Sequence, residues 1–234
     1  MSTDREMTDQ EIAPEPPTIR LVATLALAGL ISGIAIITIY EATLPTITAN
    51  KARELREAVF KVLPGVTQLQ KLVYEGGRLT PTTETVKDEQ PIYAGYDNER
   101  RFVGYAIPGA GPGFQDTIGL LYGYKSDTRQ VVGMEILESR ETPGLGDKIY
   151  KDLAFVANFE QLAVEPEIVT VKKGKKSAPN EVDAITGATI SSKAVVRIIN
   201  ETNEIWLSRL PGPGLEPPLS KGGDQRPESE QQGK

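Results

Sequence analysis

Hydroxyl side chains are concentrated in residues 183–192, which read DAITGATISS. A helical pattern begins at the end of this run, with one apolar stripe formed by Val195, Ile199, Thr202 and Trp206. The N-terminus of a helix exposes unpaired backbone N–H groups and a partial positive charge, so it binds phosphate well. Gly187 and Ala188 lack bulk and would let a ligand approach the backbone. We therefore expect Thr189 to present its oxygen to a phosphate-bearing ligand, with further hydrogen bonds from Thr186, Ser191 and Ser192.

The same run has a purely structural interpretation. Threonine and serine hydroxyls cap the first turn of many helices, a contribution of about 1 kcal/mol, and glycine turns the chain. The residue types alone leave both interpretations open.

A second candidate segment is ETPGLG, residues 141–146. Pro143 fixes one backbone angle, and the two glycines, Gly144 and Gly146, permit conformations closed to other residues. Such a loop can fold tightly over a flat ring, with Leu145 as an apolar lid and with Glu141 and Thr142 as polar contacts. The alternative is an ordinary connection between a strand and a helix.

The composition restricts the chemistry. The sequence has no cysteine and no histidine, which excludes thiolate-ligated iron–sulfur clusters, disulfides, thiol nucleophiles, histidine-ligated haem and the usual zinc sites. We expect no metal site and no catalytic residue of the chain's own, so any redox chemistry must belong to an organic cofactor. The net charge of −6 argues against nucleic acid as a partner.

The N-terminal quarter predicts a membrane anchor. Residues 1–20 are polar and proline-bearing, which is typical of disorder. Residues 21–40 carry no charge and match the thickness of a bilayer as a helix, and they favour a retained single-pass anchor over a cleaved signal peptide. Gly29 and Gly33 would permit close helix contact in lipid. The flanking cations give no orientation, because they stand on both sides: Arg5, Arg20, Lys51, Arg53 and Arg56.

The rest of the chain predicts one α+β domain. Residues 41–65 show helical spacing and would form an amphipathic linker helix that ends at Pro64-Gly65. Residues 66–210 contain short β-rich runs joined by short turns, which indicates a largely antiparallel sheet with flanking helices. Residues 211–234 are rich in proline, glycine and charge, and are predicted to be disordered.

Two further groups of residues have alternative interpretations. Five tyrosines in strand-like runs could stack on a ring, but the sequence favours sheet packing for each of them: Tyr93, Tyr96, Tyr105, Tyr122 and Tyr124. Four lysines could attract a phosphate or an acidic partner, or could form a solvated loop: Lys172, Lys173, Lys175 and Lys176.

Both motifs resemble those of the FMN-binding domain family. The run at 183–192 is similar to its flavinylation motif, D-x-x-[ST]-G-A-T-x-x-[ST], and Glu141–Ile149 is similar to its E-T-P-G-L-G loop. The order of anchor, short helix, β-rich region and motifs resembles the G subunits of Rnf electron-transport complexes. The resemblance covers roughly residues 20–210.

The resemblance implies covalent FMN on Thr189 through a phosphoester bond, with Thr142, Gly144, Leu145 and Gly146 as the main cofactor wall. It also implies a separate flavin transferase, because a threonine hydroxyl needs an activating base and the motif offers only Asp183. Asp183 would then be read by that transferase, or would be a solvated turn residue.

The expected function is electron relay through FMN inside an Rnf-type complex that couples ferredoxin and NAD to ion movement. The expected partners are the other subunits of that complex and membrane lipid. The expected location is a bacterial cytoplasmic membrane, with the soluble domain outside. The alternatives are an NqrC-like subunit of a sodium-translocating NADH:quinone oxidoreductase, or a membrane-tethered flavin-domain sensor or interaction module.

Overall fold

The computed structural model describes residues 18–82, 90–220 and 224–225. The described chain divides into two compact units between Lys51 and Ala52. The first helix, α1, runs from Thr18 to Val62 and contributes to both. Residues 1–17 of the predicted N-terminal tail lie outside the described part, whereas residues 18–20 belong to α1.

Helix α1 joins two segments that the sequence predicts separately, residues 21–40 and 41–65. It continues through Pro45, which has no backbone N–H to donate. On either side of this residue, the hydroxyls of Thr43 and Thr48 donate to the carbonyls of Ile39 and Leu44, each at 2.9 Å. By length and composition, α1 is the one helix in the described residues that could cross a membrane.

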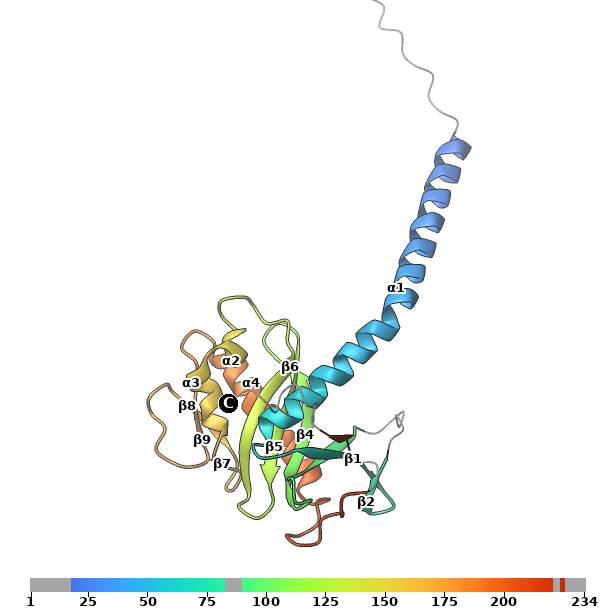
Figure 1. The fold of residues 1–234 in the computed structure, drawn as a ribbon. Helices are drawn as coiled ribbons and strands as arrows, with labels where there is room; N and C mark the ends of the chain where they lie inside the picture. The colour runs from blue at the N-terminus through green and yellow to red at the C-terminus, as the bar shows by residue number, and fades with distance from the viewer. Residues whose placement is uncertain (1–17, 83–89, 221–223, 226–234) are drawn as a thin grey trace, which may run out of the picture. The chain divides into compact units, whose positions relative to one another are not determined.

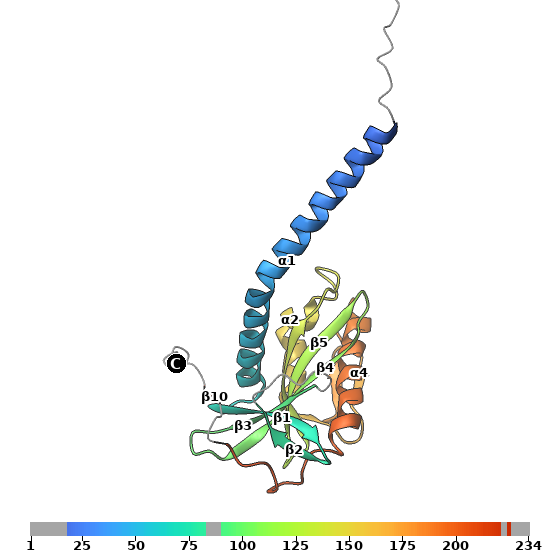
Figure 2. The same ribbon diagram turned by 90° about the vertical axis from the view of Figure 1, so that its right-hand side faces the viewer.

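The second unit is built on an antiparallel sheet (Figures 1 and 2). Its strand order is β10-β1-β3-β4-β5-β6-β7, with β2 also paired to β1. The strands are β1 (Gln68–Glu75), β2 (Arg78–Pro81), β3 (Ile92–Tyr96), β4 (Phe102–Pro112), β5 (Thr117–Lys125), β6 (Gln130–Glu138), β7 (Leu162–Ala163) and β10 (Asp224–Gln225). This confirms the predicted α+β class with a largely antiparallel sheet.

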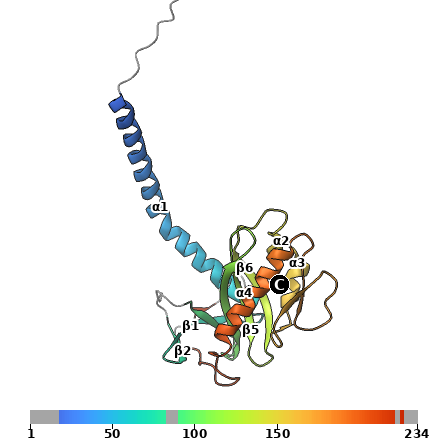
Figure 3. The ribbon, with the colours of Figure 1, turned by 180° about the vertical axis from the view of Figure 1, so that it is seen from behind.

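Short elements follow β6 and lead to the last long helix. They are α2 (Lys148–Lys151), α3 (Leu153–Val156), the 3-10 turn η1 (Ala157–Phe159), and the two parallel strands β8 (Val169–Val171) and β9 (Glu181–Asp183). Helix α4 (Thr189–Trp206) then lies across one face of the sheet (Figure 3).

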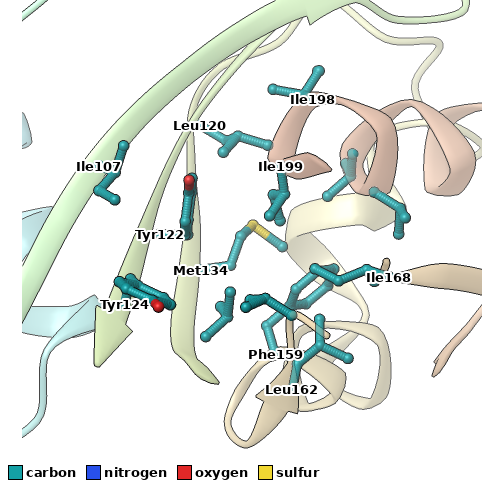
Figure 4. Close-up of a cluster of buried hydrophobic side chains, with 14 of the residues drawn as sticks. Ile107, Leu120, Tyr122, Tyr124, Met134, Phe159, Leu162, Ile168, Ile198 and Ile199 are labelled. Atoms are coloured by element: carbon teal, nitrogen blue, oxygen red, sulfur yellow. The ribbon is translucent and has the colours of Figure 1, made fainter. Parts of the chain in front are cut away.

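The two faces of the sheet carry separate cores. On one face, Tyr122 and Met134 pack among residues of α4 and the short elements, including Ile199 and Phe159 (Figure 4). The hydroxyl of Tyr122 donates to Asn203 of α4 at 2.8 Å. The opposite face is covered by the end of α1 and the turn after it, with these buried residues in contact: Val59, Val62, Leu63, Val66, Ala106 and Leu121.

Two glycines allow α1 to end directly on the sheet. A Cβ on Gly123 would lie 2.0 Å from the carbonyl oxygen of Val62, and one on Gly133 would lie 2.7 Å from the same atom. Real atoms do not approach this closely, so any side chain would push the helix end away. The second core therefore depends on bare backbone at these positions.

The C-terminal tail is ordered further than predicted. The sequence predicts disorder from residue 211, yet residues 217–220 lie against the sheet. The hydroxyl of Tyr96 donates to the carbonyl of Pro217 at 2.5 Å, and the Ser220 N–H donates to the buried side chain of Gln70 at 2.6 Å. Buried polar groups need partners, and the tail supplies them. Residues 221–223 and 226–234 of the predicted tail lie outside the described residues.

We expect Gly123→Ala to destabilise the second unit by at least about 2 kcal/mol, because the added carbon overlaps backbone rather than a movable side chain. Urea unfolding of the detergent-solubilised chain measures this. Gly119→Ala in the same strand is the matched control, since its Cβ would meet Glu138 at 3.6 Å, an ordinary contact. Equal stabilities of the two variants would contradict the close approach.

Candidate functional site

The first residue of α4 is Thr189, and its side chain is exposed. Ala188 occupies the N-cap, and no side chain of the described residues caps the helix. The hydroxyls of Thr186 and Thr189 have no hydrogen-bond partner among the described residues. The capping interpretation is therefore wrong for these two threonines. They leave an open helix N-terminus with a free hydroxyl beside it.

The two serines of the motif face inward. Ser192 is fully buried, and its hydroxyl donates to the carbonyl of Ala188 at 2.9 Å and accepts from the N–H of Ile185 at 3.0 Å. Ser191 is 3% exposed and donates to the carboxylate of Glu141 at 2.5 Å. The structure thus separates the hydroxyl run into two inner residues that hold the turn and two outer threonines.

Glu141 is a buried carboxylate that joins three segments. One oxygen accepts from the N–H groups of Phe114 and Gln115, at 2.8 and 3.0 Å, and the other accepts from Ser191. A Cβ on Gly113 or Gly146 would lie 2.5 Å from this carboxylate. Both glycines therefore make room for it.

The hydrogen bonds keep Glu141 ionised. Burial acts to raise the pKa of this carboxyl, but the donors from Ser191 and from the backbone of the 113–116 loop outweigh burial. The pKa of Glu141 consequently lies below its usual value. The sequence predicts Glu141 as a polar contact to a ring, whereas the structure places it among protein donors.

The predicted cofactor wall lies beside residues 183–192, the run that resembles a flavinylation motif. Gly144 has φ +78°, a conformation that favours glycine, and the carbonyl of Thr142 accepts from the N–H of Leu145 at 3.1 Å. The Leu145 side chain is 50% exposed, and a Cβ on Gly187 would lie 3.9 Å from it. The structure therefore brings together the two sequence motifs, which are about forty positions apart.

The loop at residues 113–116 is a part of the site that sequence reasoning treats only as a turn. Besides its bonds to Glu141, it contacts the wall through the Thr142 hydroxyl, which donates to the side chain of Gln115 at 3.0 Å. Phe114 at its tip is 63% exposed. The sequence signal for it was the glycine-rich stretch PGAGPGFQD between two strands, which typifies a tight backbone approach.

Asp183 holds a neighbouring loop. Its carboxylate accepts from the N–H groups of Lys175 and Lys176, at 3.2 and 3.1 Å. Asp183 is therefore a partner of the backbone of the lysine run rather than a residue free in solvent.

The tyrosines serve packing rather than the site. Four of them are buried in the core beneath α4, and the fifth packs on the opposite core: Tyr96, Tyr105, Tyr122, Tyr124 and Tyr93. Burial raises the pKa of Tyr96 to about 12 and that of Tyr93 above its usual value. The packing interpretation is confirmed.

Comparison with known proteins identifies the family. Residues 113–204 match the FMN-binding domain family, a range that includes the 113–116 loop, the wall and the start of α4. The G subunit of the Na(+)-translocating ferredoxin:NAD(+) oxidoreductase complex of Acetobacterium woodii is 32% identical over 193 residues, which cover 80% of this chain and 86% of that one. The chain belongs to the family of G subunits of ion-translocating oxidoreductase complexes.

A second G subunit supports the same family assignment. The G subunit of the ion-translocating oxidoreductase complex of Methanosarcina acetivorans is 29% identical over 180 residues, which cover 76% of this chain and 88% of that one. The predicted recognition of an Rnf-type G subunit is confirmed, and FMN is the cofactor that the family match supports.

Solved structures share the fold of this G subunit. The crystal structure of Shewanella oneidensis NqrC matches with a TM-score of 0.53 at 16% identity, covering 65% of this chain and 91% of that one. The C subunit of the Na(+)-translocating NADH-quinone reductase of Parabacteroides distasonis gives 0.50 at 23% identity, with 62% and 77% covered. At these identities the likeness concerns the fold alone.

We expect Glu141→Gln to lower stability at neutral pH by about 1–3 kcal/mol, the typical range for losing charged hydrogen bonds. The folded-state pKa of Glu141 is lowered, so its contribution is fully present above the unfolded value of about 4.3 and is lost as pH falls through the folded value. The gap between wild type and variant should therefore narrow in acid. Unfolding curves at successive pH values measure it.

The exposed Glu160→Gln is the control, and its curve should run parallel to that of wild type. A gap between Glu141→Gln and wild type that stays constant down to low pH would argue against an ionised Glu141.

Proposed function

We propose that this protein carries FMN bound covalently to Thr189 and relays electrons within an Rnf-type complex that is coupled as a whole to ion translocation. The observation that carries the proposal is the free, exposed hydroxyl of Thr189 at the uncapped start of α4. The other hydroxyls near this helix end are either buried or, in the case of Thr186, one turn earlier in the chain.

The residues around Thr189 fit an FMN molecule. The open N–H groups of the first turn of α4 would receive the phosphate. The exposed apolar side chains of Leu145, Ile190 and Phe114 offer surface for a flat ring. FMN bound there would supply electron transfer in single steps or in pairs.

Attachment would require a separate flavin transferase. A threonine hydroxyl needs a base, and the two nearby acids are occupied: Asp183 by backbone N–H groups and Glu141 by Ser191 and the 113–116 loop. The lowered pKa of Glu141 makes it a poor proton acceptor. A flavin dinucleotide is a suitable donor: its phosphoanhydride bond breaks, the Thr189 oxygen–phosphorus bond forms, the nucleoside monophosphate leaves, and the threonine proton passes to a base of the transferase.

The chain would exchange electrons only with other subunits. It has no cysteine or histidine to hold a second redox centre of the common kinds. On this proposal the protein positions the flavin and is not catalytic alone.

Helix α1 would anchor the protein in lipid as a single span, with the second unit on the extracytoplasmic side of the cytoplasmic membrane. Its length and apolar composition support the anchor. The assignment of the second unit to the extracytoplasmic side rests on the family resemblance. The charges give no orientation, because cations flank the span at both ends.

We expect Thr189→Ala to abolish covalent flavin when the chain is produced in cells that possess a flavin transferase. Intact mass should fall by one FMN minus water beyond the change of side chain, and in-gel flavin fluorescence should vanish. Thr128→Ala, at an exposed threonine outside the motif, is the matched control and should keep the flavin.

Flavin-free wild-type protein from such cells would overturn the proposal. Loss of flavin in Thr186→Ala but not in Thr189→Ala would move the attachment point.

A further inference from the structure

Two large apolar side chains stand exposed on the short helices next to the site. Leu153 at the start of α3 is 80% exposed, and Tyr150 in α2 is 44% exposed. Helix α2 follows directly after the cofactor wall, and the N–H of Lys148 donates to the carbonyl of Leu145 at 3.3 Å. Exposed apolar side chains that lie together beside a binding site can serve as the centre of a contact with another protein.

Lysines border this apolar surface. Lys173 lies 3.9 Å from the carboxylate of Asp152, the residue before Leu153, so the lysine loop (residues 172–176) reaches the start of α3. Lys172 and Lys175 of the same loop are exposed and form no ion pair with any described residue. The four lysines of the loop outnumber the three carboxylates beside it, those of Asp152, Glu181 and Asp183, whereas the chain as a whole has a net charge of −6.

The lysine loop has a fixed backbone. Asp183 accepts from two of its N–H groups, and the N–H of Lys175 donates to the carbonyl of Lys172 at 2.9 Å. Next to it, the carboxylate of Glu181 accepts from the N–H groups of Ser177 and Ala178, at 2.6 and 3.0 Å. A preorganised charged surface binds a partner with less loss of entropy than a mobile one.

We propose that α2, α3 and the lysine loop form a docking surface for an acidic protein surface on another subunit of the complex. The proposal rests on the proposed function for the identity of the partner. An apolar centre with a charged rim is the usual anatomy of a protein interface, and the positive rim selects an acidic partner. Its position beside Leu145 would bring that partner next to the flavin.

A photo-crosslinking experiment tests the surface in native membranes that contain the whole complex. Benzoylphenylalanine is placed at Leu153 in the full chain, and adducts are identified by mass spectrometry. We expect an adduct with another subunit of the complex, at a segment rich in aspartate and glutamate. The same probe at Leu215, which is 76% exposed on the tail, should give no such adduct.

Reversal of the charge of two lysines provides a second test of the docking surface. Lys172→Glu with Lys175→Glu should lower the yield of the Leu153 adduct about tenfold at low salt, the lower range of electrostatic steering. The control, Arg78→Glu with Lys125→Glu, changes the net charge equally at positions outside the lysine loop and should leave the yield unchanged.

The docking surface would be overturned by adducts to lipid alone or by the absence of an adduct. An adduct yield that is unchanged by the Lys172→Glu and Lys175→Glu substitutions would overturn it as well. Intact mass from the same membranes reports flavin on Thr189 separately. A chain that lacks flavin but still forms the adduct would contradict the proposed attachment of FMN and would support the docking surface.

Discussion

The candidate site depends on one buried carboxylate. Glu141 accepts hydrogen bonds from the 113–116 loop and from the first turn of α4, and it belongs to the segment that is predicted to form the cofactor wall. A buried anion is tolerated only when its donors offset the loss of water, and this set of donors does so. Removal of any one segment would leave the others with unpaired groups. The hydrogen bonds of this single charge therefore hold the three segments to one another, in addition to the apolar core beneath α4.

The sheet gives this charge a rigid base. Residues of α4 pack on one face and the end of α1 on the other, so that Tyr122 and Leu121, neighbours in β5, belong to opposite cores. The start of α4 is thereby fixed with its N–H groups open, while Ser192 closes the turn from inside. Within one short motif, the serine hydroxyls thus stabilise the fold, whereas the threonine hydroxyls are exposed and available for chemistry.

Sequence reasoning gave the main architecture because its signals are local. The apolar run of α1, the alternating runs that became β3 to β6 and the stripe of α4 all follow from residue periodicity. The roles of Glu141, Ser191 and Asp183 were not predictable in this way, because their partners lie far away in the chain or in backbone groups. The tail from residue 211 was mispredicted for the same reason. Its composition is typical of disorder, yet it forms hydrogen bonds with the buried side chains of Gln70 and Tyr96.

The close approach of Val62 to Gly123 limits where the second unit can be separated from the candidate membrane span. The last turns of α1 are part of its interior, since Ala58, Val59 and Val62 are almost fully buried. A protease cut or a truncation must therefore fall before Ala52, where the second unit begins. A cut a few turns later would remove Ala58, Val59 and Val62 from the second core and expose the apolar residues that they cover.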